Sequence, residues 1–176
     1  MRGNMSDGNI ILIGMPGTGK TTVGKLLSEI LEYSFIDTDI LVTDKTGKTP
    51  RQLVEEHGRE YFIRVQDEVV LDIHSSNCVI STGGGLVHSD ISMNHLKEIG
   101  KVIFLNTSYQ VIKERMDASR KLVRTGGNLK DLYDERTPLY IKYADKIIEC
   151  DNSEPNIICQ KIIGFFRDLK IAGKFS

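Results

Sequence analysis

The chain has 176 residues, of which 40% are hydrophobic, and this is enough for one domain with a hydrophobic core of its own. We therefore expect a single domain over residues 1–176, without a separate regulatory module. The formal net charge of −1 supplies no overall field for nucleic acid or an anionic membrane, so neither is expected as a partner.

Five short apolar runs alternate with helical patterns along the chain, which is typical of parallel βαβ units. The expected strands cover residues 9–13, 34–36, 78–81, 101–105 and 146–150. A helix is expected from residue 22, and later helices over 49–57, 59–74, 91–99, 109–116, 130–143 and 156–171. We predict an α/β fold, a three-layer α/β/α sandwich around a five-stranded parallel sheet, with ligands at the carboxyl ends of the strands.

The first strand runs into a phosphate-binding motif at residues 14–21, Gly-Met-Pro-Gly-Thr-Gly-Lys-Thr. Glycines let successive backbone N–H groups turn toward phosphate oxygens, and the N-terminus of the following helix adds its positive dipole. Lys20 would reach the β- and γ-phosphates, and the Thr21 hydroxyl would hold Mg²⁺. The expected nucleotide-binding residues here are Gly14, Gly17, Thr18, Gly19, Lys20, Thr21 and Thr22. The alternative, a turn that is merely rich in glycine, would have to match this whole pattern by chance.

The second strand is followed by Asp37-Thr38-Asp39, which places two carboxylates on alternate residues. In an extended segment these side chains point to the same side. One carboxylate would bind Mg²⁺ through water and the other would orient or deprotonate an acceptor hydroxyl. On the motif alone, Asp37 could instead cap a helix and Asp39 could be solvated.

Glycine-rich segments follow later in the chain. After the third strand, Thr82-Gly83-Gly84-Gly85 lets a ligand approach backbone N–H groups, although such a run is also found in ordinary loops. Residues 115–130 combine glycines with arginines and predict a mobile lid that closes over the transferred phosphate. Each arginine taken alone fits an ordinary solvated basic helix and turn better.

The order and approximate spacing of these motifs resemble the shikimate kinase family over residues 9–163. The motifs are the P-loop, Asp37-x-Asp39, Gly58-x-x-x-Phe62, the triple glycine, the arginine-bearing lid and Arg136-Thr137-Pro138-Leu139-Tyr140. The resemblance implies a five-stranded parallel sheet of the P-loop nucleoside-monophosphate-kinase type. It also implies transfer of the ATP γ-phosphate to the 3-hydroxyl of shikimate, a step of aromatic amino acid biosynthesis, with Mg²⁺ as cofactor.

On the nucleotide side, the resemblance implies roles by matching position. Lys20 and Thr21 serve ATP and Mg²⁺, and Asp37 helps to hold the metal. Arg120 is the catalytic lid arginine and Arg115 stacks on adenine. The lid departs from the family pattern, because Arg120-Lys121-Leu122-Val123 replaces Arg-Pro-Leu-Leu. Arg115 and Arg120 are also closer in sequence than the lid arginines of the family commonly are, which leaves Arg124 as an alternative lid arginine.

On the acceptor side, the resemblance implies a substrate-binding helical segment at about residues 40–75. Asp39 binds the acceptor hydroxyl and acts as the catalytic base. Gly84 and Gly85 offer backbone contacts, and Arg136 pairs with the acceptor carboxylate.

The substrate helix departs from the family where its members carry Gly-Glu-x-x-Phe-Arg-x-x-Glu. The ungapped match places Ile63 at the arginine and Gln66 at the glutamate, so both halves of an ion pair are absent. Joint loss indicates an altered pocket rather than a damaged one. Arg59 lies four residues before Ile63 on the same helical face, whereas Arg64 is about 100° around the helix. Arg59 is therefore the better candidate for the acceptor carboxylate, and Ile63 is expected to face the acceptor.

The function predicted from the sequence is an ATP-dependent small-molecule kinase with shikimate as the leading acceptor. A kinase of the same fold for another polyol or hydroxy acid, such as gluconate, remains open, as does a non-catalytic nucleotide-binding paralogue. A binding module has no need of the acceptor-side carboxylate Asp39, which argues against the last. We expect a cytoplasmic protein, because the three cysteines have no paired or metal-like spacing and the first residues lack the apolar segment of a signal peptide, and we expect it to be a monomer.

Overall fold

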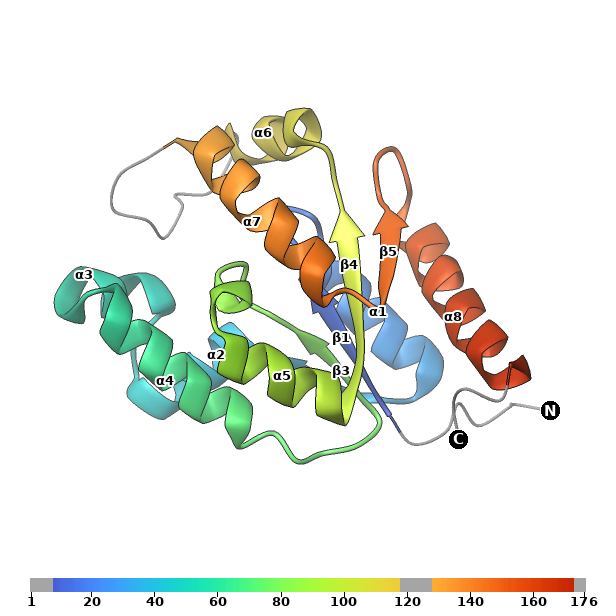
Figure 1. The fold of residues 1–176 in the computed structure, drawn as a ribbon, viewed down its shortest axis with the longest axis horizontal. Coiled ribbons are helices and arrows are strands. Elements are labelled where there is room, and N and C mark those ends of the chain that lie inside the picture. The colour runs from blue at the N-terminus through green and yellow to red at the C-terminus, as the bar shows by residue number, and fades with distance from the viewer. Residues whose placement is uncertain (1–7, 118–127, 173–176) are drawn as a thin grey trace.

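The fold was analysed in a computed structural model that describes residues 8–117 and 128–172. Within these residues, five parallel strands form one sheet in the order β2-β3-β1-β4-β5 (Figure 1). The strands are β1 (Asn9–Ile13), β2 (Ser34–Asp37), β3 (Cys78–Ser81), β4 (Gly100–Asn106) and β5 (Lys146–Glu149). The helices are α1 (Lys20–Leu31), α2 (Thr38–Thr46), α3 (Pro50–His57), α4 (Arg59–Leu71), α5 (Asp90–Ile99), α6 (Tyr109–Asp117), α7 (Leu129–Tyr143) and α8 (Pro155–Ile171), with a short 3₁₀ turn, η1, at Leu86–His88.

The sheet is covered on both faces, which confirms the predicted three-layer α/β fold (Figure 1). Every residue of the central strand β1 is buried, because helices lie on both of its sides. Ile10 and Leu12 pack against α1 and α8, whereas Ile11 and Ile13 pack on the other face, where α4, α5 and α7 lie. Successive residues of β1 thus belong to different hydrophobic clusters, as the alternation of side chains in a strand requires.

The expected strands agree with the observed ones to within one residue at each end. The helix expected over residues 59–74 ends earlier, at Leu71, and the first helix begins at Lys20 rather than at residue 22. None of the helices in the described part of the chain is long and apolar enough to cross a membrane. All three cysteines are buried and unpaired.

One expectation was wrong. The segment Asp37-Thr38-Asp39 is not extended, because α2 begins at Thr38, and Asp37 is the N-cap of that helix. The Asp37 carboxylate accepts a hydrogen bond from the backbone N–H of Asp39 at 3.0 Å. Only Thr38 and Val42 of α2 are buried, so the helix has little apolar periodicity for sequence analysis to detect.

The strand order decides where the functional motifs meet. Because β3 lies between β1 and β2, the segments that follow these three strands are side by side at one edge of the sheet. The P-loop follows β1, Asp37 ends β2, and the triple glycine follows β3. The Thr82 hydroxyl donates a hydrogen bond to the Leu12 carbonyl across 70 residues of sequence, which joins the ends of β3 and β1. The motifs that follow these strands therefore form a single site.

Candidate active site

One cavity of about 580 Å³ lies at the carboxyl edge of the sheet, at the ends of β1, β2 and β3. Its wall is formed by the P-loop, the start of α2, the glycine turn after β3, and faces of α4 and α7. The residues expected from the sequence that line it are Gly17, Gly19, Lys20, Thr21, Thr22, Asp37, Asp39, Arg59, Ile63, Gly84, Gly85 and Arg136. The phosphate-binding loop and the expected acceptor residues thus share one chamber.

The P-loop requires glycine at two positions for different reasons. At Gly19, which caps α1, φ is 95°, a left-handed conformation that favours glycine. At Gly14, a Cβ atom would lie 2.8 Å from the carbonyl oxygen of Leu105, so a side chain would push the loop away from β4. Gly14 and the buried Thr18 lie behind the cavity wall. Both therefore shape the loop from behind.

Lys20 is the first residue of α1 and lies folded over the loop. Its ammonium donates to the carbonyl oxygens of Gly14 at 2.7 Å and Met15 at 2.9 Å, and only 8% of the residue is exposed. The N-terminus of α1 adds backbone N–H groups that attract anions at the same place. Lysine and helix dipole together provide the positive charge that the phosphates of a nucleotide need.

Thr21 and Asp37 place a hydroxyl oxygen and a carboxylate next to each other at the start of α1. The Thr21 hydroxyl donates to the Asp37 carboxylate at 3.2 Å, across 16 residues of sequence. A hydroxyl and a carboxylate suit Mg²⁺, which in P-loop kinases takes its remaining ligands from phosphate and water. Asp37 therefore both caps α2 and presents its second oxygen to the site, so the two interpretations of this residue are compatible.

Asp39 lies on the first turn of α2 against the glycine turn. A Cβ atom on Gly83 would be 2.4 Å from the Asp39 Oδ1, so any side chain at this position would displace the carboxylate. The neighbouring Thr38 hydroxyl accepts from the Gly83 N–H at 2.9 Å, which joins the two segments. Burial and the nearby Asp37 carboxylate raise the pKa of Asp39, and the Lys20 charge partly opposes this rise. A carboxylate with a raised pKa is a stronger base than an ordinary aspartate.

Arg136 reaches from α7 under the same glycine turn. Its guanidinium lies so close that Cβ atoms on Gly84 and Gly85 would be 3.1 and 3.2 Å from its two terminal nitrogens. The Tyr140 hydroxyl, one turn along α7, donates to the Gly84 carbonyl at 2.6 Å and fixes the turn. Burial lowers the pKa of Arg136, Tyr140 and the Glu135 carboxylate partly oppose this fall, and the like charge of Arg59 makes the smallest contribution, a further lowering. Arg136 and Arg59 are thus close enough to repel each other, and an anion between them would relieve the repulsion.

One face of α4 lines the cavity through Arg59, Ile63 and Gln66, which are four and three residues apart. Arg59 is exposed, Ile63 is half-buried and Gln66 is buried, so the face runs from the rim of the cavity to its floor. Arg64 points elsewhere. It lies over the ring of Tyr61, 5.8 Å from the centroid, and lines a separate hollow on the outer side of α4.

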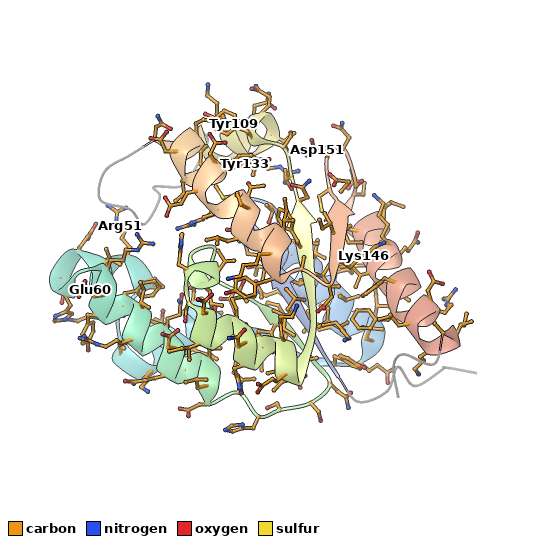
Figure 2. All side chains as sticks on the ribbon, viewed as in Figure 1. Arg51, Glu60, Tyr109, Tyr133, Lys146 and Asp151 are labelled. Carbon is orange, nitrogen blue, oxygen red and sulfur yellow. The ribbon has the colours of Figure 1, made fainter. Side chains whose placement is uncertain are left out.

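The lid expected over residues 115–130 is described only at its ends. Arg120 and Arg124 lie outside the described residues. Arg115 is exposed and donates to the Gly17 carbonyl at 3.1 Å, so it lies against the P-loop. Tyr109 of α6 precedes this segment in sequence and Tyr133 of α7 follows it. Their rings pack edge to face with centroids 5.7 Å apart (Figure 2), and this contact joins the two helices that flank the segment.

Some cavity residues were not predicted as site residues. Leu132 and Glu135 line the wall from α7, and Met116 lines it from α6. Leu132 could have been found, because it lies four residues before Arg136 on the same helical face. Nothing in the sequence pointed to Met116. Gln66 was noticed only as a replaced residue, and its position in the cavity floor comes from the structure.

The family model described as shikimate kinase matches residues 16–167. The chain belongs to the shikimate kinase family. A shikimate kinase from Clostridium botulinum (strain Alaska E43) is 39% identical over 152 residues, which cover 85% of this chain and 92% of that protein. The shikimate kinase of Nitrosospira multiformis is 36% identical over 161 residues, covering 88% and 83%. Members of this family are ATP-dependent phosphotransferases that act on an alcohol group, and the chain is one of them.

Solved structures give the same family. Shikimate kinase from Acinetobacter baumannii in complex with shikimate superimposes with a TM-score of 0.87 at 31% identity, covering 94% of this chain and 96% of that one. Shikimate kinase from Aquifex aeolicus has a TM-score of 0.80 at 32% identity, covering 94% and 99%. A gluconokinase from Sinorhizobium meliloti has a TM-score of 0.57 at 19% identity, covering 93% of each chain, and shares the fold. The P-loop nucleoside-monophosphate-kinase-like fold predicted from the sequence is confirmed.

Proposed function

We propose that this protein transfers the γ-phosphate of ATP to the 3-hydroxyl of shikimate. The observation that carries the proposal is that one cavity joins the P-loop to a half-buried carboxylate, Asp39, and a buried cation, Arg136. A phosphoryl donor, a base and a partner for an acid group are the three elements that the reaction needs.

The nucleotide half uses the P-loop. Lys20 and the N-terminus of α1 bind the phosphates, and Thr21 and Asp37 supply protein ligands for Mg²⁺. The bound ion would neutralise charge on the β- and γ-phosphates. Arg115 lies at the mouth of the loop, from where it would cover the adenine. Arg120, with Arg124 as the alternative, would bring a further positive charge to the transferred group.

The acceptor half places the reacting hydroxyl against Asp39. As the hydroxyl oxygen forms its bond to the γ-phosphorus, its proton passes to the Asp39 carboxylate, and the bond between that phosphorus and the bridging oxygen breaks to release ADP. Backbone atoms of Gly84 and Gly85 contact the acceptor, because no side chain separates them from the cavity. The acceptor carboxylate lies between Arg136 and Arg59, where it offsets their mutual repulsion.

Alternative acceptors are considered because Ile63 and Gln66 on α4 replace the arginine and glutamate of the family. A kinase of this fold for another polyol or hydroxy acid, such as gluconate, would place apolar carbon against Ile63 in place of an arginine contact. A non-catalytic role is disfavoured, because Lys20, Thr21, Asp37 and Asp39 all line the cavity. We further propose a cytoplasmic location, supported by three buried, unpaired cysteines, and a monomer, whose oligomeric state light scattering would measure.

ATP turnover against shikimate, quinate and gluconate tests the proposal directly. Shikimate should give the highest kcat/KM, and phosphorus NMR of the product should place the phosphate on the 3-hydroxyl. Preference for another acid by tenfold or more, or ATP turnover that no acceptor stimulates, would overturn it.

Arg136→Ala should raise the KM for shikimate about tenfold or more. Charge-assisted hydrogen bonds to a carboxylate contribute about 1.5 to 3 kcal/mol each, and this guanidinium lies buried in the cavity wall. Steady-state kinetics with shikimate and with its neutral methyl ester provide the measurement and its control, because the ester should lose far less. An unchanged KM for shikimate would place the carboxylate elsewhere.

Restoring the family's ion pair is the second test of the acceptor. If shikimate is the acceptor and residue 66 serves only to hold a cation at residue 63, Ile63→Arg combined with Gln66→Glu should tighten shikimate binding by at least about 1.4 kcal/mol, or tenfold, because the carboxylate gains a further cation. Ile63→Arg alone is the control, since it adds the charge without its partner. If the native acceptor is another molecule, the double variant should lower kcat/KM for that molecule by burying a poorly matched charge. No change with any acceptor would show that position 63 does not face it.

A further inference from the structure

Gln66 on the cavity floor is the least satisfied polar side chain that lines the site. The residue is 1% exposed, yet neither its side-chain nitrogen nor its side-chain oxygen has a hydrogen-bond partner among the described residues. An unsatisfied buried polar group is destabilising, and it usually marks a ligand or water that completes it. Ile63, one turn earlier on α4, has an apolar side chain and cannot form a hydrogen bond with the Gln66 amide.

The chemistry of the amide limits what can complete it. A primary amide presents a donor and an acceptor side by side in one plane. A carboxylate only accepts, so it would satisfy the Gln66 nitrogen and leave the oxygen facing a negative charge. Two hydroxyls on adjacent carbons satisfy both atoms at once, since one accepts from the nitrogen while its neighbour donates to the oxygen. The change from charged to neutral side chains along α4 fits this assignment, because the cation Arg59 lies at the exposed rim of the cavity and the neutral Gln66 amide lies on its floor.

We propose that Gln66 is a specificity-determining residue whose side-chain amide binds a vicinal diol of the acceptor, leaving the carboxylate to Arg59 and Arg136. This rests on the proposed function, because shikimate keeps two adjacent hydroxyls, at carbons 4 and 5, when the 3-hydroxyl reacts. Ile63 then packs against the ring carbons between the diol and the carboxylate. The face of α4 that lines the cavity thus has a neutral hydrogen-bonding contact with the acceptor at Gln66 in place of the arginine–glutamate ion pair of the family.

The test couples the side chain to the hydroxyls it is proposed to bind. Gln66→Met removes both polar atoms at similar volume, and the kcat/KM for shikimate should fall about 10- to 30-fold, the value of two neutral hydrogen bonds. With 4-deoxyshikimate or 5-deoxyshikimate as the acceptor, the wild type should already have lost most of this factor, and Gln66→Met should add little. With shikimate methyl ester, by contrast, the variant should show its full loss.

Matched controls separate the possible failures. Gln160→Met makes the same chemical change at an exposed position of α8 and should leave all these ratios unchanged. ADP affinity of Gln66→Met should stay near the wild type, which shows that the nucleotide site is intact, and the Tm of the free variant should equal or exceed the wild-type value, because the substitution removes an unsatisfied buried polar group. Equal losses for shikimate and both deoxy analogues would overturn the assignment of Gln66 while the proposed function stands. A wild type that fails to phosphorylate shikimate would overturn both.

Discussion

Lys20→Ala is expected to reduce phosphoryl transfer to background, a loss of at least about a thousandfold in kcat. The ammonium lies over the P-loop on the carbonyls of Gly14 and Met15, where it neutralises charge that develops on the transferred group. Coupled-assay kinetics measure the loss. Lys20→Met should give the same result, although it keeps the length of the buried stem and so the packing of the loop.

The control for Lys20→Ala is Lys25→Ala on the same helix. The Lys25 side chain is exposed and its ammonium lies over the Phe35 ring, 5.9 Å from the ring centroid, so truncating this side chain should leave kcat within about twofold. A folded Lys20→Ala protein that keeps wild-type turnover would end the assignment of this loop as the phosphate site.

Asp39→Asn is expected to lower kcat by about 10²-fold or more, the usual contribution of a general base, with little change in ATP affinity. The pH profile carries further information. Because burial and Asp37 raise the pKa of Asp39, the wild-type acidic limb should lie above the pH range of an ordinary aspartate. Activity should fall as the pH drops through that pKa, since the ionised form is the base. The variant should lose this limb.

Stability supplies an independent readout for the same substitution. A carboxyl whose folded pKa exceeds its unfolded value binds its proton more tightly in the folded state, so ionised Asp39 disfavours folding at neutral pH. Asp39→Asn should therefore not lower the Tm at neutral pH, even though it removes activity. Asp44→Asn, at an exposed position of α2, is the control and should change neither quantity. Lost ATP binding with acceptor chemistry retained would mean that the roles of Asp37 and Asp39 are reversed.

Local chemistry explains why much of the fold was predictable from the sequence. The strands β1 and β3 are continuous apolar runs because helices cover both faces of a parallel sheet, and such runs are visible without a structure. The P-loop is equally local, since its glycines, lysine and threonine lie within eight consecutive residues. The Thr49-Pro50 start of α3 forms the expected cap, with Thr49 accepting from the Gln52 N–H.

Other elements depended on neighbours that the sequence does not show. The helix α2 is held by an aspartate cap and by a hydrogen bond from Gly83, 45 residues away, so its own apolar pattern is weak. Helical geometry alone predicted that Arg59 and Arg64 point to different sides of α4. The repulsion between Arg59 and Arg136 could not be predicted in this way, because it depends on α4 and α7 lining the same cavity.

The sequence by itself determined the fold class, the phosphate-binding loop and the family, because these are written in contiguous motifs and in the periods of strands and helices. The tertiary structure decided the properties of the acceptor site. The raised pKa of Asp39, the burial of Arg136 under Gly84 and Gly85, and the unsatisfied amide of Gln66 all arise from contacts between elements far apart in the chain. Burial and electrostatic neighbours set the chemistry of a side chain, and both exist only once the sheet has brought β2, β3 and the helices together.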